Sequence, residues 1–281
     1  MASEPKTPEK PDDTLIPFSS NEEASRIYLL PNTMTAGNLF CGFIAVIFCI
    51  KANFAGDPEI TKQFYLQAVW CILGAVVFDS LDGRLARLGG KESLFGAEFD
   101  SIADIVSFGM APALLVYFLI LSPESGYPFF EKIGWIIGFI YLLCAAVRLA
   151  RFNVITSPLL PKHEKLAGHK DFLGLPVPAA AGLIASLVFL ITNYELKTWS
   201  IILPFLMLLI AFLMVSSVRY PSFKKVGWQT TMKPRVFIGA IALIAAIINY
   251  HEVALALLFV AYIIGGLVLH FTQHKRPGNS V

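Results

Sequence analysis

The chain has 281 residues, of which 56% are hydrophobic and only 15% are charged. Because a soluble domain carries about 25% charged residues, this composition excludes an ordinary water-soluble protein and predicts that most of the chain lies in lipid. The formal net charge of +2 is close to neutral and does not indicate binding to nucleic acid.

The chain begins with a polar segment, residues 1–25, that is rich in proline, serine and charge. It lacks the apolar core of a signal peptide. This composition predicts a disordered tail on the side of the membrane where the chain starts.

The apolar segments after this tail are long enough to cross a membrane, because a spanning helix needs about 20 mostly apolar residues. The sequence therefore predicts an all-α integral membrane protein with about eight transmembrane helices. The predicted spans are 32–51, 64–82, 99–122, 133–152, 175–193, 197–216, 235–250 and 252–272. A very short turn around Tyr250 and His251 joins the last two, which predicts a tight hairpin.

The cysteines lie singly within these apolar runs, at Cys41, Cys49, Cys71 and Cys144. Their spacing matches no metal site. This pattern favours small buried hydrophobic side chains over a disulfide framework.

Lysine and arginine residues are distributed unevenly about the spans. The side opposite the termini holds only Lys51, Lys62, Lys132 and Lys197, and all other lysines and arginines fall on the side of the termini. Cytoplasmic segments carry an excess of these residues. The pattern predicts that both termini, and the segment between the second and third spans, are cytoplasmic, at the inner membrane if the cell is bacterial.

That segment contains four aspartates on two predicted helix faces. Residues of the helix that leaves the membrane recur at helical spacing on one face: Asp79, Asp82, Gly83, Ala86 and Arg87. A turn is predicted at Gly89 and Gly90. Asp100 and Asp104 then share one face of the next helix with Gly96. The two faces can meet near the membrane surface.

Four carboxylates so close together cannot all stay ionised without cations. Hard ions such as Mg²⁺ or Mn²⁺ take oxygen ligands, and no histidine or cysteine lies nearby to indicate zinc. Two such ions would hold a diphosphate, and Arg87 is available to a phosphate. The alternative is that acids at helix ends simply face water, but charged groups at membrane depth are functional by default.

The pattern D-x-x-D-G-x-x-A-R-x8-G-x3-D-x3-D over residues 79–104 resembles the signature of the CDP-alcohol phosphotransferases. The resemblance implies a six-helix membrane domain, here residues 26–216, that is usually a homodimer and opens a two-metal site to the cytoplasm. Such enzymes attack a CDP-linked donor with an alcohol and release CMP. Residues 217–281, predicted as a basic loop and a C-terminal two-helix hairpin, extend beyond this core.

The resemblance also implies roles for single residues. The metal ions would be bound by Asp79, Asp82 and Asp100. Asp104 would be a further metal ligand or the general base that accepts the proton of the alcohol. Gly83 and Arg87 would hold the CDP moiety.

The start of the first span, "PNTMTAGN", offers three polar side chains, Asn32, Thr35 and Asn38. They either reach the nucleotide or phosphates, or cap and pack the first helix. The sequence leaves both readings open.

The stretches "SFGMAP", "RLARFN" and "GLPVPAAA" are similar to the phosphatidylserine synthase branch of this family over roughly residues 31–225. This similarity implies L-serine as acceptor, CDP-diacylglycerol as donor and phosphatidylserine as product. Arg151 and Phe152 match the motif associated with the serine pocket, and Arg148 and Asn153 are further candidates. From the residues alone, the two arginines either anchor the helix at the membrane surface or bind an anionic group.

Two alternatives remain at this point. The acceptor could be another anion, glycerol 3-phosphate or inositol phosphate. A cation-coupled transporter would also use carboxylates in the membrane, but such proteins commonly show inverted repeats and broken helices near mid-membrane. Neither is visible in the sequence, and the aspartates cluster at one surface.

Overall fold

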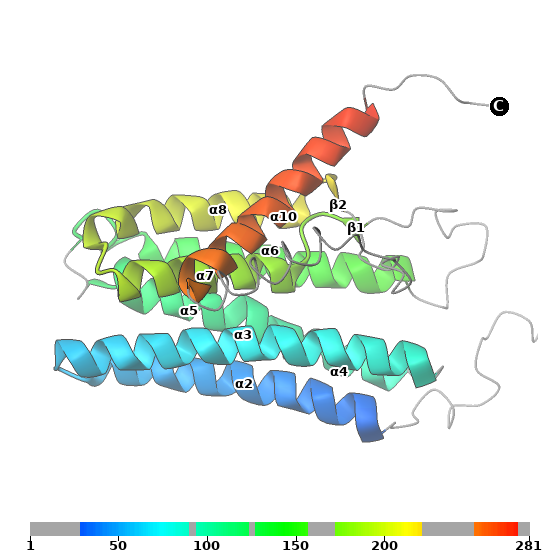
Figure 1. The fold of residues 1–281 in the computed structure, drawn as a ribbon, viewed down its shortest axis with the longest axis horizontal. Helices are drawn as coiled ribbons and strands as arrows, with labels where there is room; N and C mark the ends of the chain where they lie inside the picture. The colour runs from blue at the N-terminus through cyan, green and yellow to red at the C-terminus, as the bar shows by residue number, and fades with distance from the viewer. Residues whose placement is uncertain (1–28, 90–93, 124–126, 157–171, 221–249, 275–281) are drawn as a thin grey trace, which may run out of the picture.

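The computed structural model describes residues 29–89, 94–123, 127–156, 172–220 and 250–274. Most of the long helices run along the long axis of the molecule, and the last one, α10, crosses them at an angle (Figure 1). The helices are α2 (Leu29–Phe54), α3 (Pro58–Gly89), α4 (Leu94–Asp104), the π-helical η2 (Ile105–Met110), α5 (Ala111–Val116), the π-helical η3 (Tyr117–Leu121), α6 (Gly134–Thr156), α7 (Val177–Asn193), the 3-10 helix η5 (Lys197–Ile201), α8 (Ile202–Val215) and α10 (His251–His274); the strands are β1 (Phe172–Leu173) and β2 (Arg219–Tyr220).

The predicted helical membrane class is confirmed. Six helical segments of the described chain are long and apolar enough to cross a membrane: Leu29–Phe54, Pro58–Leu85, Phe95–Leu121, Gly134–Ile155, Thr198–Val215 and Val253–His270. The predicted span 175–193 corresponds to α7, which is apolar but only 17 residues long. The predicted span 235–250, and with it the predicted hairpin, lies outside the described residues. All four cysteines are free.

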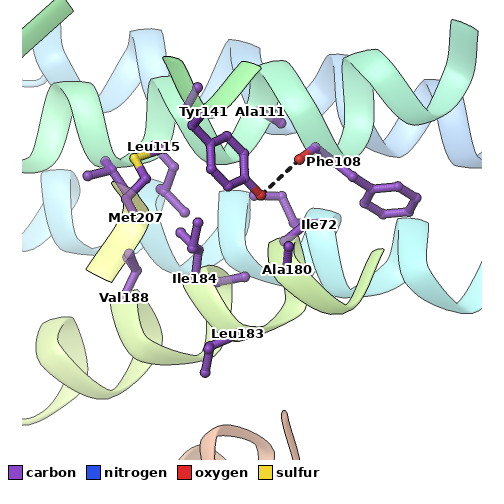
Figure 2. Close-up of a cluster of buried hydrophobic side chains, with 14 of the residues drawn as sticks. Ile72, Phe108, Ala111, Leu115, Tyr141, Ala180, Leu183, Ile184, Val188 and Met207 are labelled. Atoms are coloured by element: carbon purple, nitrogen blue, oxygen red, sulfur yellow. Dashed lines mark hydrogen bonds between the residues drawn. The ribbon is translucent and has the colours of Figure 1, made fainter. Parts of the chain in front are cut away.

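The core of the bundle is built around α7. Buried side chains point from α7 in several directions, as is typical of a helix enclosed by its neighbours. Ile184 and Val188 of α7 lie in one buried cluster with Leu115 of α5, Met207 of α8 and Ile72 of α3 (Figure 2). This packing fixes α3 relative to the helices on the other side of α7.

A short antiparallel ladder adds to the helices, which the sequence did not predict. Its strands pair Phe172 with Tyr220 and Leu173 with Arg219. Strands of two residues are too short to produce the alternating pattern by which a strand is recognised. The ladder lies at the end of the bundle where α7 begins and α8 ends (Figure 1).

Gly174 ties this ladder to the end of α8. Its φ angle is +79°, in the left-handed region that favours glycine. Its N–H donates to the carbonyl of Val218 at 2.8 Å, and the N–H of Leu175 donates to the carbonyl of Leu213 at 3.1 Å. A Cβ at Gly174 would lie 3.2 Å from the carbonyl oxygen of Ser216. The glycine of the "GLPVP" stretch is therefore required by geometry.

The third membrane segment is not a continuous α-helix. Its first part, α4, ends at Asp104, the π-helical turn η2 follows, and α5 resumes with Pro112 in its first turn. Proline has no N–H to donate to the carbonyl four residues earlier, which is that of Phe108. The hydroxyl of Tyr141 donates to this carbonyl at 3.1 Å instead (Figure 2).

Replacing Tyr141 by phenylalanine is expected to lower the stability of the protein by about 1 kcal/mol, because the buried hydrogen bond from the Tyr141 hydroxyl to the Phe108 carbonyl is lost. Thermal unfolding in detergent measures the change. Tyr194→Phe, at an exposed position, is the matched control and should leave the melting temperature unchanged. Equal melting temperatures for all three proteins would contradict this account of η2.

Candidate active site

Three of the four predicted aspartates come together at one end of the bundle. Asp79 and Asp82 lie on α3 and Asp100 lies on α4. Each offers one carboxylate oxygen, and these oxygens all lie within 4.8 Å of one another. The structure therefore brings the two aspartate faces together, as their helical spacing indicated.

The chemistry of this cluster fits a hard divalent cation. Its donors are carboxylate oxygens only, the ligand type that Mg²⁺ and Mn²⁺ prefer. Asp100 Oδ1 is buried and accepts no hydrogen bond from any described residue. A buried carboxylate oxygen without a donor is unfavourable, and a cation between the three side chains would satisfy it.

Asp104 is held somewhat apart from these three. It is only 5% exposed and lies one helical turn after Asp100, at the last residue of α4. Asn38 Nδ2 donates to Asp104 Oδ1 at 3.0 Å. Asp104 lies within electrostatic range of the other three carboxylates, but it is not in the group of oxygens within 4.8 Å. Its role as metal ligand or general base stays a prediction.

The polar side chains of α2 support the aspartates. Thr35 Oγ1 lies 3.1 Å from Asp82 Oδ2 and donates to it, and Asn38 donates to Asp104. From the sequence, we expected these side chains either to contact the nucleotide or to cap and pack the first helix. Hydrogen bonds to the aspartates were not expected, although positions 35 and 38 lie on one helix face. Asn32 Nδ2 is buried with no partner among the described residues, so it keeps a donor for a ligand.

A close helix approach positions Asn38, and the sequence reasoning missed it. Ser107 of η2 donates from Oγ to the carbonyl of Asn38 at 2.8 Å. A Cβ built on Gly42 would lie 2.6 Å from the Cα of Ser107, so only glycine lets α2 approach η2 here. Gly42 lies one helical turn after Asn38, and this spacing is the signal that the sequence contained.

Gly83 and Arg87 lie on α3 with the aspartates. Gly83 follows Asp82 directly and is partly buried. The backbone of Arg87 belongs to α3, but its side chain lies outside what the structure describes. The predicted contacts of both residues with CDP stay predictions.

Arg148, on α6, is buried beside the aspartates. It is 8% exposed and lies within electrostatic range of Asp104 and Asp79. Its guanidinium lies 5.2 Å from the ring centroid of Phe152. Among the described residues it forms neither a hydrogen bond nor an ion pair within 4.0 Å. A buried guanidinium that forms no ion pair or hydrogen bond is unfavourable, so this position fits an anionic ligand.

Arg151 and Asn153 have partners of their own. Arg151 is exposed, and its Nη1 donates to the carbonyl of Val215, the last residue of α8, at 3.5 Å. Asn153 Nδ2 donates to Ser101 Oγ at 2.9 Å and so links α6 to α4. These contacts fix the end of α6 against both neighbours.

A cavity of about 650 Å³ lies at the opposite end of the bundle. Its lining includes Ala52 at the end of α2, Pro58 at the start of α3 and Thr192 at the end of α7. None of the predicted site residues lines it. The carboxylate cluster, with its buried charges, is therefore the candidate active site, and this cavity is not.

Comparison with known proteins extends these observations. The sequence matches the CDP-alcohol phosphatidyltransferase family over residues 28–216. A CDP-diacylglycerol–serine O-phosphatidyltransferase of Helicobacter pylori is 35% identical over 245 residues, 86% of this chain and 91% of that protein. One of Methanocaldococcus jannaschii is 37% identical over 69% of this chain and 79% of that protein. An archaetidylserine synthase of Methanothermobacter thermautotrophicus is 32% identical, with coverages of 75% and 77%.

The matched range contains the three-aspartate cluster, Asp104 and Arg148. It ends at residue 216, so β2 and α10 lie beyond it. Two thirds of the sequence and the carboxylate cluster thus lead to one assignment: the chain belongs to the CDP-alcohol phosphatidyltransferase family.

Proposed function

We propose that this protein transfers the phosphatidyl group of CDP-diacylglycerol to the hydroxyl of L-serine and releases CMP. The observation that carries the proposal is the cluster of three carboxylates in a membrane bundle, with the buried cation of Arg148 in electrostatic range. Such a site suits a diphosphate held by cations and an anionic acceptor beside it.

The choice of serine rests on the relatives. The names of the Helicobacter pylori and Methanocaldococcus jannaschii proteins specify serine as acceptor and CDP-diacylglycerol as donor. The archaetidylserine synthase has a different lipid in its name, but its product is again a serine lipid. Serine is the acceptor common to these names, which supports it for this chain.

Asp79, Asp82 and Asp100 would hold two divalent cations, Mg²⁺ or Mn²⁺. When bound, the cations neutralise the charge of the diphosphate and stabilise the leaving phosphate. Asp104 is proposed as a further ligand or, in the step described next, as the base. Thr35 and Asn38 position two of these carboxylates through their hydrogen bonds.

In the transfer step, the serine hydroxyl oxygen bonds to the phosphorus that carries the diacylglycerol. The bond from this phosphorus to the oxygen bridging to CMP breaks, and CMP leaves with that electron pair. Asp104 accepts the hydroxyl proton at Oδ2, while Asn38 holds Oδ1. The remaining contribution to the rate is positioning, because both substrates would be bound side by side.

The substrates would contact residues on three helices. Asn32, Gly83 and Arg87 would hold the CDP moiety, and the buried unpaired Nδ2 of Asn32 supports its part. The serine would lie against α6, where the proposed contacts are Arg148, Arg151, Phe152 and Asn153. The burial of Arg148 and its stacking on Phe152 support this location.

We also propose that the active site and both termini face the cytoplasm, since lysine and arginine are concentrated on that side. The catalytic unit would be residues 26–216, close to the matched range 28–216. Residues 1–25 would be a disordered tail, and residues 217–281 a basic loop with a two-helix hairpin. The protein would act as a homodimer, as the family resemblance implies.

An acceptor comparison tests the proposal. The purified protein in detergent is given CDP-diacylglycerol, Mg²⁺ or Mn²⁺, and labelled serine, glycerol 3-phosphate or inositol phosphate in separate reactions. We expect CMP release and labelled lipid with serine only. CMP release with one of the other acceptors and none with serine would overturn the serine assignment, and ion flux in vesicles without CMP release would overturn the enzyme.

A further inference from the structure

The segment beyond residue 216 contributes two tyrosines next to Arg148. Tyr220 lies in β2 and Tyr262 lies in α10. Both are outside the range that matches the family, residues 28–216.

Tyr220 has an unsatisfied polar group. Its side chain is fully buried, and its hydroxyl has no hydrogen-bond partner among the described residues. Native proteins rarely leave a buried hydroxyl unpaired, so an unpaired one calls for a ligand or water. Burial also raises the pKa of Tyr220, so the hydroxyl stays protonated and remains a donor.

Tyr262 connects Tyr220 to Arg148. The rings of Tyr220 and Tyr262 lie 5.8 Å apart between centroids. Tyr262 is within electrostatic range of Arg148, and Arg148 is within range of Asp104 and Asp79. Tyr262 therefore has its ring beside Tyr220 and its phenol within electrostatic range of Arg148.

The structure holds α10 in this place through two glycines. A Cβ on Gly266 of α10 would lie 3.2 Å from Cγ of Tyr220, so the helix backbone lies directly against that ring. A Cβ on Gly182 of α7 would lie 2.8 Å from Cε2 of Phe259, so the same helix packs closely on the core. Such approaches are typical of helices that pack in membranes through small residues.

A carboxylate accepts hydrogen bonds, and both a guanidinium and a phenol hydroxyl can donate them. Among the described residues, Arg148 has no ion pair within 4.0 Å and the Tyr220 hydroxyl has no hydrogen-bond partner, and one carboxylate would satisfy both. The acceptor proposed above, serine, carries such a group next to its hydroxyl.

We propose that Tyr220 and Tyr262 complete the acceptor pocket with Arg148 and recognise the carboxylate of an amino-acid acceptor. The inference rests on the proposed function and deepens it. β2 and the C-terminal helix thereby add to the acceptor pocket that begins with Arg148, while the donor is held by the segment shared with the family.

The test removes only the hydroxyls, in Tyr220→Phe and Tyr262→Phe. Steady-state CMP release is measured against serine and, separately, against CDP-diacylglycerol. We expect the KM for serine to rise about tenfold for Tyr220→Phe, with kcat and the KM for CDP-diacylglycerol within about twofold of the unchanged protein. Tyr250→Phe, at an exposed tyrosine just before α10, is the control and should change none of these values.

A second measurement uses ethanolamine, which is serine without its carboxylate. We expect the unchanged protein to prefer serine strongly and the Tyr220→Phe variant to lose about tenfold of this preference. A serine KM that stays unchanged in both variants, or that rises only together with the KM for CDP-diacylglycerol, would overturn the pocket. Failure of the unchanged protein to use serine would instead overturn the proposed function, so the two failures are distinguishable.

Discussion

Replacing Asp100 by asparagine is expected to lower CMP release by about 10³-fold. The substitution keeps the size of the side chain but removes one of the three charges in the cluster. It also replaces a carboxylate oxygen by an NH₂ group on a side chain whose Oδ1 is buried and unpaired. The substitution would thereby weaken the proposed cation site without changing the packing.

The measurement is CMP release over a range of Mg²⁺ and Mn²⁺ concentrations, with metal binding followed by calorimetry. Glu98→Gln, an exposed position on the same helix, is the matched control and should retain activity. In the presence of a chelator, the Asp100 variant should unfold at a temperature equal to or above that of the unchanged protein, since one buried like charge is gone. A fully active Asp100→Asn protein, or one that binds metal normally, would contradict the proposed site.

Replacing Arg148 by alanine is expected to lower kcat/KM for serine by about 10²-fold. Arg148 is the buried cation next to Asp104 and Asp79, and it has no anionic partner within 4.0 Å among the described residues. An anionic acceptor would lose its counter-charge. Arg148→Lys should recover only part of the loss, because an ammonium group cannot replace the planar donor fork.

Arg151→Ala provides the comparison within the same motif. Arg151 is exposed and donates to the end of α8, so its removal should lower the melting temperature and reduce kcat/KM less than Arg148→Ala does. Lys132→Ala, an exposed cation at the other end of α6, controls for loss of charge alone. A larger kinetic loss for Arg151→Ala than for Arg148→Ala would contradict the position of the acceptor.

The membrane class and the aspartate faces could be predicted from the sequence because both depend on simple periodicity. Apolar runs of about 20 residues define spans, and spacings of three and four residues place Asp79, Asp82 and Asp100 on facing stripes. The spacing also placed Asp104 on the same stripe as Asp100. It did not predict that Asn38 donates to Asp104, or that Asp104 lies outside the group formed by the other three carboxylates.

Contacts between segments far apart in the chain could not be predicted from the sequence. Thr35 and Asp82 are 47 positions apart, and Asn38 and Asp104 are 66 apart, so no local spacing connects them. The position of Tyr220 depends on a two-residue ladder and on Gly266, which leaves no periodic signal. The π-helical turn likewise follows from Pro112 together with its neighbours, rather than from any pattern of apolar residues.

The helix α7 is short for a membrane-spanning helix, and this bears on how a water-soluble acceptor would meet a lipid donor. Its 17 residues extend about 25 Å, less than the roughly 30 Å of a bilayer's hydrocarbon layer. At the aspartate end, the backbone turns at Gly174 and pairs with β2 instead of continuing as a helix. The backbone N–H groups of Gly174 and Leu175 are thus paired within the protein, as backbone beside a short membrane helix must be. In the proposed reaction, a water-soluble acceptor would meet the donor at this shortened end of the bundle, while the acyl chains of the donor stay in the bilayer.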